Sequence, residues 1–94
     1  MSISDIKKQI SPILKRNGVE KAAVFGSFAR GEAKRKSDVD ILIKFRGNNK
    51  SLFDLTGLQL ELEEKLKRNV DILTYNSLHP FLRKDVLSEQ KIIL

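Results

Sequence analysis

The chain has 94 residues, of which 40% are apolar, 32% charged and 6% aromatic. This length suits one globular domain, so we expect a single domain over residues 1–94, without a second domain or a lid. The absence of cysteine excludes a disulfide framework, a thiolate zinc site and a thiol nucleophile. No apolar run reaches the roughly 18–20 residues of a membrane helix, and the first residues, MSISDIKK, lack the apolar stretch of a signal peptide, so we expect a cytoplasmic protein without a membrane partner.

The net charge of +6 is concentrated in the first half of the chain. Residues 1–50 carry 12 Lys and Arg against 5 Asp and Glu, whereas residues 51–94 carry 6 against 7. Such asymmetry favours an anionic partner such as a nucleotide, a nucleic acid or an acidic protein. A solvated, Lys-rich surface is the simpler explanation of the charge taken alone.

The first predicted element is a helix that begins at a Ser2–Asp5 capping box and ends before Gly18. Apolar residues recur at helical spacing between these two points. Pro12 lies inside the helix and removes a backbone donor. We therefore expect a kink there, or a helix that starts anew near Ser11.

Short apolar runs alternate with helices along the rest of the chain. Residues 22–25 and 39–45 predict two interior strands. The remaining predicted elements follow in order: a helix from a capping box at Ser51 to about Lys67, a strand over residues 70–73, a turn over 76–80, a short helix over 81–87, and a strand or tail over 92–94. This order predicts an α/β (α+β) fold with one small mixed sheet of about four strands flanked by helices.

The first strand ends on Gly26 and Ser27, a turn that favours phosphate binding. A residue without a side chain lets the backbone approach a ligand, and a following helix would direct free N–H groups at an anion. Ser27 adds a hydroxyl donor, and Arg30 adds a planar cation within one turn before Gly31 ends the segment. An ordinary strand-to-helix turn is the simpler explanation of the Gly-Ser pair considered alone.

Carboxylates at the strand ends strengthen the prediction of a ligand site. Asp38 and Asp40 are two residues apart at the start of the second strand, so their side chains point to the same face. Asp71 interrupts another apolar strand, where a carboxylate is costly unless it faces a polar site. If the second and third strands are neighbours, the three carboxylates converge, and hard divalent cations such as Mg²⁺ take oxygen ligands of this kind together with substrate phosphates. The alternative is a turn residue at Asp38 and an exposed strand edge at Asp40.

These motifs resemble a known family of proteins. Gly26-Ser27, ten further residues and Asp38-Val39-Asp40 match the G-S-x10-D-x-D signature of the DNA polymerase β-like nucleotidyltransferase superfamily. The fuller sequences GSFARG and SDVDILI, followed by SLFDL and VDIL, are similar to the minimal nucleotidyltransferase (MNT) group within it. The resemblance covers nearly the whole chain and implies a polymerase β-like nucleotidyltransferase fold.

The resemblance also implies roles for individual residues. Gly26, Ser27 and Arg30 would bind the phosphates of ATP, and Asp38 and Asp40 would hold two Mg²⁺ ions. Asp71 would be the third catalytic carboxylate, helping to hold the metal nearest the acceptor. The basic residues at positions 34–36 could steer an anionic substrate, although a solvated loop explains them as well.

The resemblance finally implies a partner, because a chain of this size lacks an acceptor-binding domain. MNT proteins form the antitoxin half of pairs with HEPN-domain ribonuclease toxins, and the implied activity is transfer of AMP from ATP to a toxin tyrosine. The alternatives are a non-catalytic antitoxin that neutralises the toxin by binding, and a transferase acting on a small molecule such as an aminoglycoside. A homo-oligomer is possible, and the shortage of aromatic platforms argues against direct nucleic-acid binding. His79 receives no role, and Tyr75 and Phe81 are expected to pack.

Overall fold

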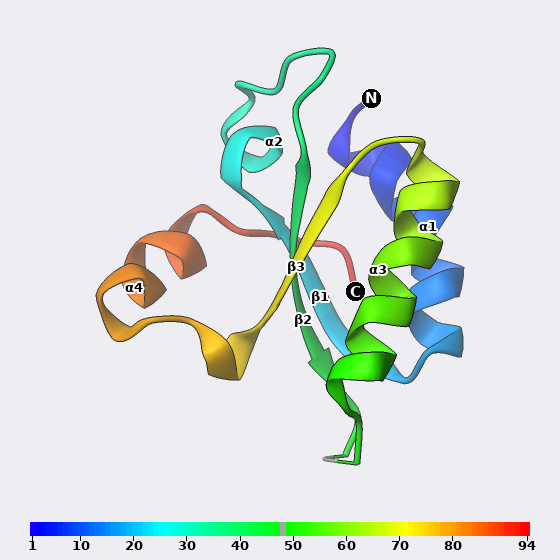
Figure 1. The fold of residues 1–94 in the computed structure, drawn as a ribbon. Coiled ribbons are helices and arrows are strands. Elements are labelled where there is room, and N and C mark those ends of the chain that lie inside the picture. The colour runs from blue at the N-terminus through cyan, green and yellow to red at the C-terminus, as the bar shows by residue number, and fades with distance from the viewer. Residues whose placement is uncertain (48) are drawn as a thin grey trace.

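The computed structural model describes residues 1–47 and 49–94, and its centre is a four-stranded mixed sheet (Figure 1). The strands are β1 (Val19–Phe25), β2 (Val39–Phe45), β3 (Val70–Thr74) and β4 (Lys91–Ile92). They lie in the order β3-β2-β1-β4, with β1 antiparallel to β2 and β4, and β2 parallel to β3. The predicted fold class, with β1 and β2 in the interior of the sheet, is therefore confirmed.

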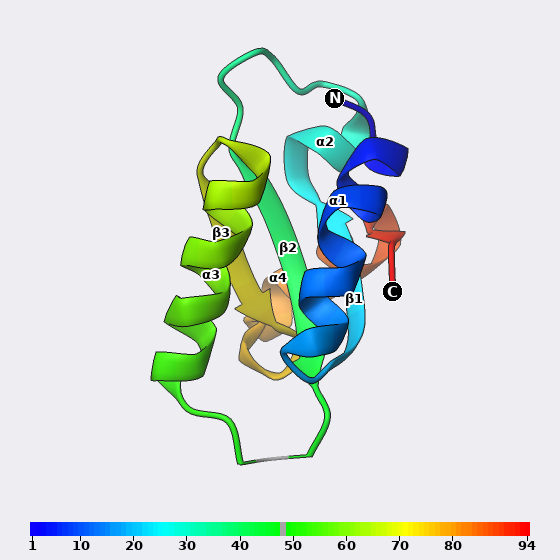
Figure 2. The ribbon, with the colours of Figure 1, turned by 90° about the vertical axis from the view of Figure 1, so that its right-hand side faces the viewer.

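Helices cover both faces of the sheet. They are α1 (Ile3–Arg16), α2 (Gly26–Arg30), α3 (Leu52–Leu66), the 3₁₀ helix η1 (Tyr75–Ser77) and α4 (Pro80–Glu89). α1 and α3 lie side by side on one face, whereas α4 lies on the other face (Figures 1 and 2). Within the described residues, no helix combines the length and the apolar character needed to span a membrane.

α1 is one continuous helix, so of the two expectations for Pro12, a kink or a restart near Ser11, the restart is wrong. Pro12 lies inside the helix, but the residues before and after it share one buried apolar stripe against the sheet. Burial of that stripe stabilises both halves as parts of one helix and outweighs the single hydrogen bond that Pro12 cannot donate. The stripe consists of Ile6, Ile10, Ile13 and Leu14.

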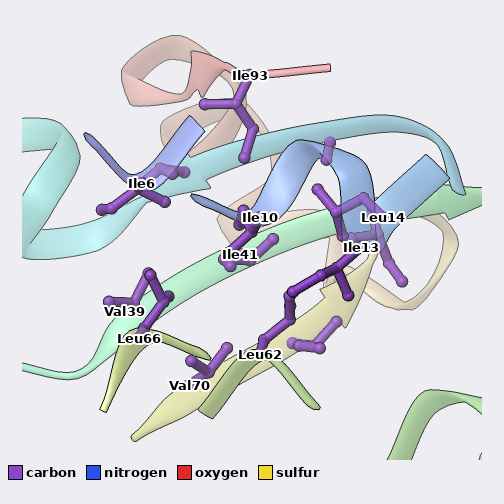
Figure 3. Close-up of a cluster of buried hydrophobic side chains, with 14 of the residues drawn as sticks. Ile6, Ile10, Ile13, Leu14, Val39, Ile41, Leu62, Leu66, Val70 and Ile93 are labelled. Carbon is purple, nitrogen blue, oxygen red and sulfur yellow. The ribbon is translucent and has the colours of Figure 1, made fainter. Parts of the chain in front are cut away.

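The alternation of side chains along β2 divides the sheet into a core face and a site face. Val39, Ile41 and Ile43 are fully buried in the main core beneath α1 and α3 (Figure 3). The intervening Leu42 packs on the other face with residues of η1 and α4. Asp40 points the same way as Leu42, because residues two apart in a strand share a face. The carboxylate of Asp40 therefore lies on the face that carries α4.

The capping box of α1 gives the first testable prediction. The Ser2 hydroxyl accepts a hydrogen bond from the Asp5 N–H at 3.1 Å, and the Asp5 carboxylate accepts one from the Ser2 N–H at 2.9 Å. Ser2→Ala should lower the free energy of unfolding by about 1 kcal/mol. Urea denaturation measures this loss. Ser88→Ala, which removes an exposed hydroxyl from α4, is the control and should cost less than about 0.5 kcal/mol.

Candidate active site

The turn between β1 and α2 brings the backbone of Gly26 against the side chain of Asp40. Gly26 has φ +71°, a backbone conformation that favours glycine. A Cβ atom at this position would lie 2.2 Å from Oδ2 of Asp40, which is closer than any real contact. The register that pairs Phe25 with Asp40 produces this approach. Glycine is therefore required at position 26 for the carboxylate to lie beside the turn.

Asp40 and Asp71 lie directly opposite each other on the parallel strands β2 and β3. Because paired residues of neighbouring strands point to the same face, both carboxylates project from the site face of the sheet. Asp38 precedes β2 by one residue and is exposed. Its charge still acts on Asp40, so the three carboxylates predicted from the sequence all contribute to one negative region.

The electrostatics of this region favour the binding of a cation beside Asp40. Burial, followed by the charges of Asp71 and Asp38, raises the pKa of Asp40 to about 6, and Arg30 opposes the shift only in part. Within residues 1–47 and 49–94, no three acidic, imidazole or thiol groups already converge as a ready-made metal cluster. Asp40 and Asp71 therefore fit a hard divalent cation whose remaining ligands are oxygens of a substrate or water.

A pH titration of stability can test the strain on Asp40. The pKa of Asp40 is 3.8 in the unfolded chain and about 6 in the folded protein. The folded state therefore loses stability as the pH rises from 3.8 through about 6, where the half-buried carboxyl has to ionise. Asp40→Asn should therefore be more stable than the wild type above pH 6, and the two should converge below pH 4. Because Asp40 is only half-buried, screening by solvent limits the gain to about 1 kcal/mol. Thermal melting between pH 4 and pH 8, without divalent cations, measures the difference, and a constant difference would contradict this prediction.

Arg30 and Ser27 lie on the short helix α2, which begins at Gly26. Ser27 is half-buried, and Arg30 extends its guanidinium along the surface. Nε of Arg30 donates to Glu32 at 3.0 Å, and Nη1 donates to Glu89 at 3.3 Å. The Gly26 N–H also donates to Glu89, at 3.1 Å. The predicted phosphate-binding groups Gly26 and Arg30 thus converge on one point, which a carboxylate occupies.

Glu89 was not anticipated from the sequence, and no local signal could have revealed it. It lies 63 residues from Gly26 and is an ordinary charged residue two positions beyond the helix predicted over residues 81–87. The pairing of β4 with β1 and the contact of α4 with α2 bring the two together. Its side chain is 27% exposed, so it lies in the site rather than beyond it.

Basic residues surround the exposed carboxylate of Asp38. Nη1 of Arg68 donates to the carbonyl of Ser37 at 3.3 Å, and the Val39 N–H donates to the carbonyl of Asn69 at 3.0 Å. These contacts fix the segment before β2 against the turn that follows α3. The hollow at this point is lined by Asp38, Asn69 and four cations, Arg35, Lys36, Lys67 and Arg68.

The residues after β3 differ in part from expectation. Tyr75 is buried as expected, and its hydroxyl donates to Gln90 at 2.7 Å. The expectation that Phe81 packs is wrong, because its ring is 88% exposed and stacks on the turn residue His79, which is also exposed. α4 packs toward η1 through the half-buried Val86 and Leu87 of its second half, and its first turn leaves Phe81 in solvent. His79 caps α4 by accepting a hydrogen bond from the Phe81 N–H.

The chain belongs to the polymerase β nucleotidyltransferase family. The sequence model of the protein family described as "Polymerase beta, Nucleotidyltransferase" matches residues 8–94 of this chain. The match includes every residue of the proposed site, and the fold agrees with it. The class of protein predicted from the Gly-Ser turn and the paired aspartates is therefore confirmed.

Two relatives place the chain more closely within this family. A candidate protein adenylyltransferase of Methanocaldococcus jannaschii, MJ0435, is 52% identical over 94 residues, and the alignment covers 100% of both chains. The protein adenylyltransferase MntA of Thermococcus cleftensis is 45% identical over 74 residues, which cover 79% of this chain and 74% of that protein. The chain is thus similar to proteins named for AMP transfer to protein.

Solved structures share the fold. A structure of a candidate minimal nucleotidyltransferase is 36% identical, has a TM-score of 0.82, and is matched over 97% of this chain and 95% of that one. A chain in the complex of the tri-AMPylated Shewanella oneidensis HEPN toxin with an MNT antitoxin has a TM-score of 0.75 at 19% identity, over 97% and 71% of the two chains. At that identity the second likeness supports the fold alone.

Proposed function

We propose that this nucleotidyltransferase is an antitoxin that transfers AMP from ATP to a tyrosine hydroxyl of a HEPN ribonuclease partner. The observation that carries the proposal is the side-by-side placement of Asp40 and Asp71 next to the Gly26 turn. The names of the MJ0435 and MntA relatives support protein as the acceptor. A cytoplasmic location, where ATP and such a partner meet, is part of the proposal.

In this proposal the residues of the turn bind and orient the triphosphate. The Gly26 N–H and the Arg30 guanidinium donate to phosphate oxygens, with the Ser27 hydroxyl as a further donor. The acceptor oxygen then attacks the α-phosphorus, and the bond to the leaving pyrophosphate breaks. The donors on the turn hold that pyrophosphate as its charge develops.

Asp38, Asp40 and Asp71 are proposed as the ligands of two Mg²⁺ ions. When bound, Mg²⁺ supplies charge stabilisation to the attacking and leaving oxygens. The raised pKa of Asp40 supports the fit, because a cation between the carboxylates would relieve their repulsion. Asp71, on the exposed edge of the sheet, is suited to accept the proton of an incoming tyrosine hydroxyl or to orient it.

The test combines this protein, a HEPN partner, ATP and Mg²⁺, and follows the mass of the partner. The proposal predicts mass increases of whole AMP units on a tyrosine, with none when Mg²⁺ is replaced by a chelator. Labelling of this protein itself, or of neither protein, would contradict the proposed acceptor. The same assay with an aminoglycoside in place of the partner tests the small-molecule alternative.

A non-catalytic antitoxin that acts by binding alone is the second candidate. The exposed Phe81 and Leu82 on α4 favour it, since apolar side chains in solvent are suited to a protein contact. In this case the Asp38→Ala/Asp40→Ala variant would still bind the partner and still inhibit its ribonuclease activity.

Size-exclusion chromatography of the pair and of the protein alone would also test the proposed homo-oligomer. We also propose that the protein does not bind DNA or RNA directly. Salt-dependent binding of the protein to DNA or RNA in the absence of ATP would contradict this.

A further inference from the structure

The carboxylate of Glu89 occupies the point at which the donors of the turn converge. It accepts a hydrogen bond from the Gly26 N–H at 3.1 Å, and its two oxygens lie 3.3 and 3.4 Å from Nη1 of Arg30. A carboxylate and a phosphate make the same kinds of contact with a backbone N–H and a guanidinium. Glu89 therefore satisfies, within the chain, the groups that a phosphate would need.

The sheet register places Glu89 there. β4 pairs with β1 so that Ala23 lies opposite Ile92 and Val24 lies opposite Lys91. The pairing does not extend to Gly26, which begins α2, or to Glu89, which ends α4, but it brings the end of α4 close to the start of α2. The backbone of Glu89 is thus held near the turn by the neighbouring strand pairing, and its side chain reaches the Gly26 N–H and Arg30.

Contacts on both sides of Glu89 hold it in that place. The Tyr75 hydroxyl donates to the side chain of the next residue, Gln90, at 2.7 Å. Before it, Val86 and Leu87 pack against the cluster formed by Leu42, Tyr75 and Leu78. The end of α4 is therefore fixed, and only the Glu89 side chain needs to rotate to vacate the turn.

We propose that Glu89 is a positioning residue that sets the affinity for the triphosphate by occupying its anion subsite in the nucleotide-free chain. The inference rests on the proposed function, because it takes Gly26 and Arg30 as the phosphate-binding groups. A triphosphate has to displace the Glu89 carboxylate from both donors and then tolerate a negative charge at the edge of the site. Glu89 thus weakens triphosphate binding, while it keeps the two donors paired and oriented when no nucleotide is bound.

The chain offers matched variants for a test by isothermal titration calorimetry. Glu89→Gln removes the charge and keeps the side-chain shape, and Glu89→Ala removes both contacts. Glu32→Gln frees Arg30 from its other carboxylate and leaves the Gly26 contact in place. Glu64→Gln makes the same charge change on the exposed side of α3, on the opposite face of the sheet (Figure 2). Circular dichroism and thermal melting verify that each variant is folded.

ATP with Mg²⁺ and tripolyphosphate with Mg²⁺ are the two probes. Glu89→Ala and Glu89→Gln should each bind both probes more tightly than the wild type, with the Kd for the alanine variant lower by roughly tenfold. An equal gain for both probes would support a contact at the phosphates rather than at the base. Glu32→Gln should gain less, and Glu64→Gln should bind as the wild type does.

Two results would overturn the inference. If Glu89→Ala binds both probes as weakly as the wild type or more weakly, Glu89 does not compete with phosphate, while the proposed function stands as long as the wild type binds ATP. If neither the wild type nor any variant binds either probe, the proposed phosphate site fails together with the inference. Binding by Glu89→Ala alone would support the inference in its strongest form, in which Glu89 blocks the turn.

Discussion

Asp40→Asn is expected to lower the rate of AMP transfer by roughly three orders of magnitude or more while the protein stays folded. Asparagine keeps the size of the side chain but loses the charge that would hold Mg²⁺ beside Gly26. The fold does not need that charge, because burial and the neighbouring Asp71 already raise the pKa of Asp40 to about 6. The variant therefore loses activity through the site and not through unfolding.

The initial rate of AMP incorporation into the partner, with saturating ATP and Mg²⁺, measures this loss. Asp85→Asn is the matched control, since it removes one exposed carboxylate from α4 and should retain the wild-type rate. Thermal melting at pH 7 should show that Asp40→Asn is at least as stable as the wild type. A transfer rate within tenfold of the wild type would exclude Asp40 as a metal ligand in the proposed reaction.

Gly26→Ala is expected to combine a loss of activity with a loss of stability. The added Cβ would lie 2.2 Å from Oδ2 of Asp40, so the carboxylate or the turn has to move. Displacement of a reacting group by about 1 Å can lower a rate by about a hundredfold, and we expect at least that loss. The backbone at φ +71° adds roughly 1–2 kcal/mol of strain for any residue with a side chain.

Gly31→Ala separates these two effects. Gly31 has nearly the same backbone conformation, φ +73°, but a Cβ atom there would meet no atom within 4 Å. Gly31→Ala should therefore lose only the stability that backbone strain costs, about 1 kcal/mol in the free energy of unfolding measured with urea. It should retain most of the transfer activity. If the two alanine variants were equally active, the close approach of Asp40 to the turn would have no catalytic importance.

Local patterns were sufficient to predict most of the fold. The second strand was predicted over residues 39–45 and is observed over the same residues, because its apolar run is long and ends in polar residues. Both capping boxes were also predicted from four residues each. The failures at Ser11 and Phe81 have one physical cause, which is that packing against a distant element decides whether a helix continues past proline and whether an aromatic ring is buried.

The sequence also predicted the candidate site only as far as its residues are close together along the chain. Gly26, Ser27, Asp38 and Asp40 lie within 15 residues of one another, so spacing alone was able to associate them. Asp71 was included only on the condition that its strand neighbours the second one, and the parallel pairing of β2 with β3 meets that condition. Glu89 depends on the register between β1 and β4, which no periodicity in the sequence encodes.

The terminal strand β4 is the shortest in the sheet, with only Lys91 and Ile92 assigned to it. Beyond it, the Ala22 N–H donates to the Leu94 carbonyl at 3.1 Å, while β1 pairs along most of its length with β2 on its other side. Short pairings at an edge open by local unfolding far more often than central ones. Amide hydrogens of β1 that point to β4 should therefore exchange with solvent deuterium faster than those that point to β2. The exchange rate at Ala22 thus reports how often the carboxyl-terminal segment, with Glu89 beside it, detaches from the sheet.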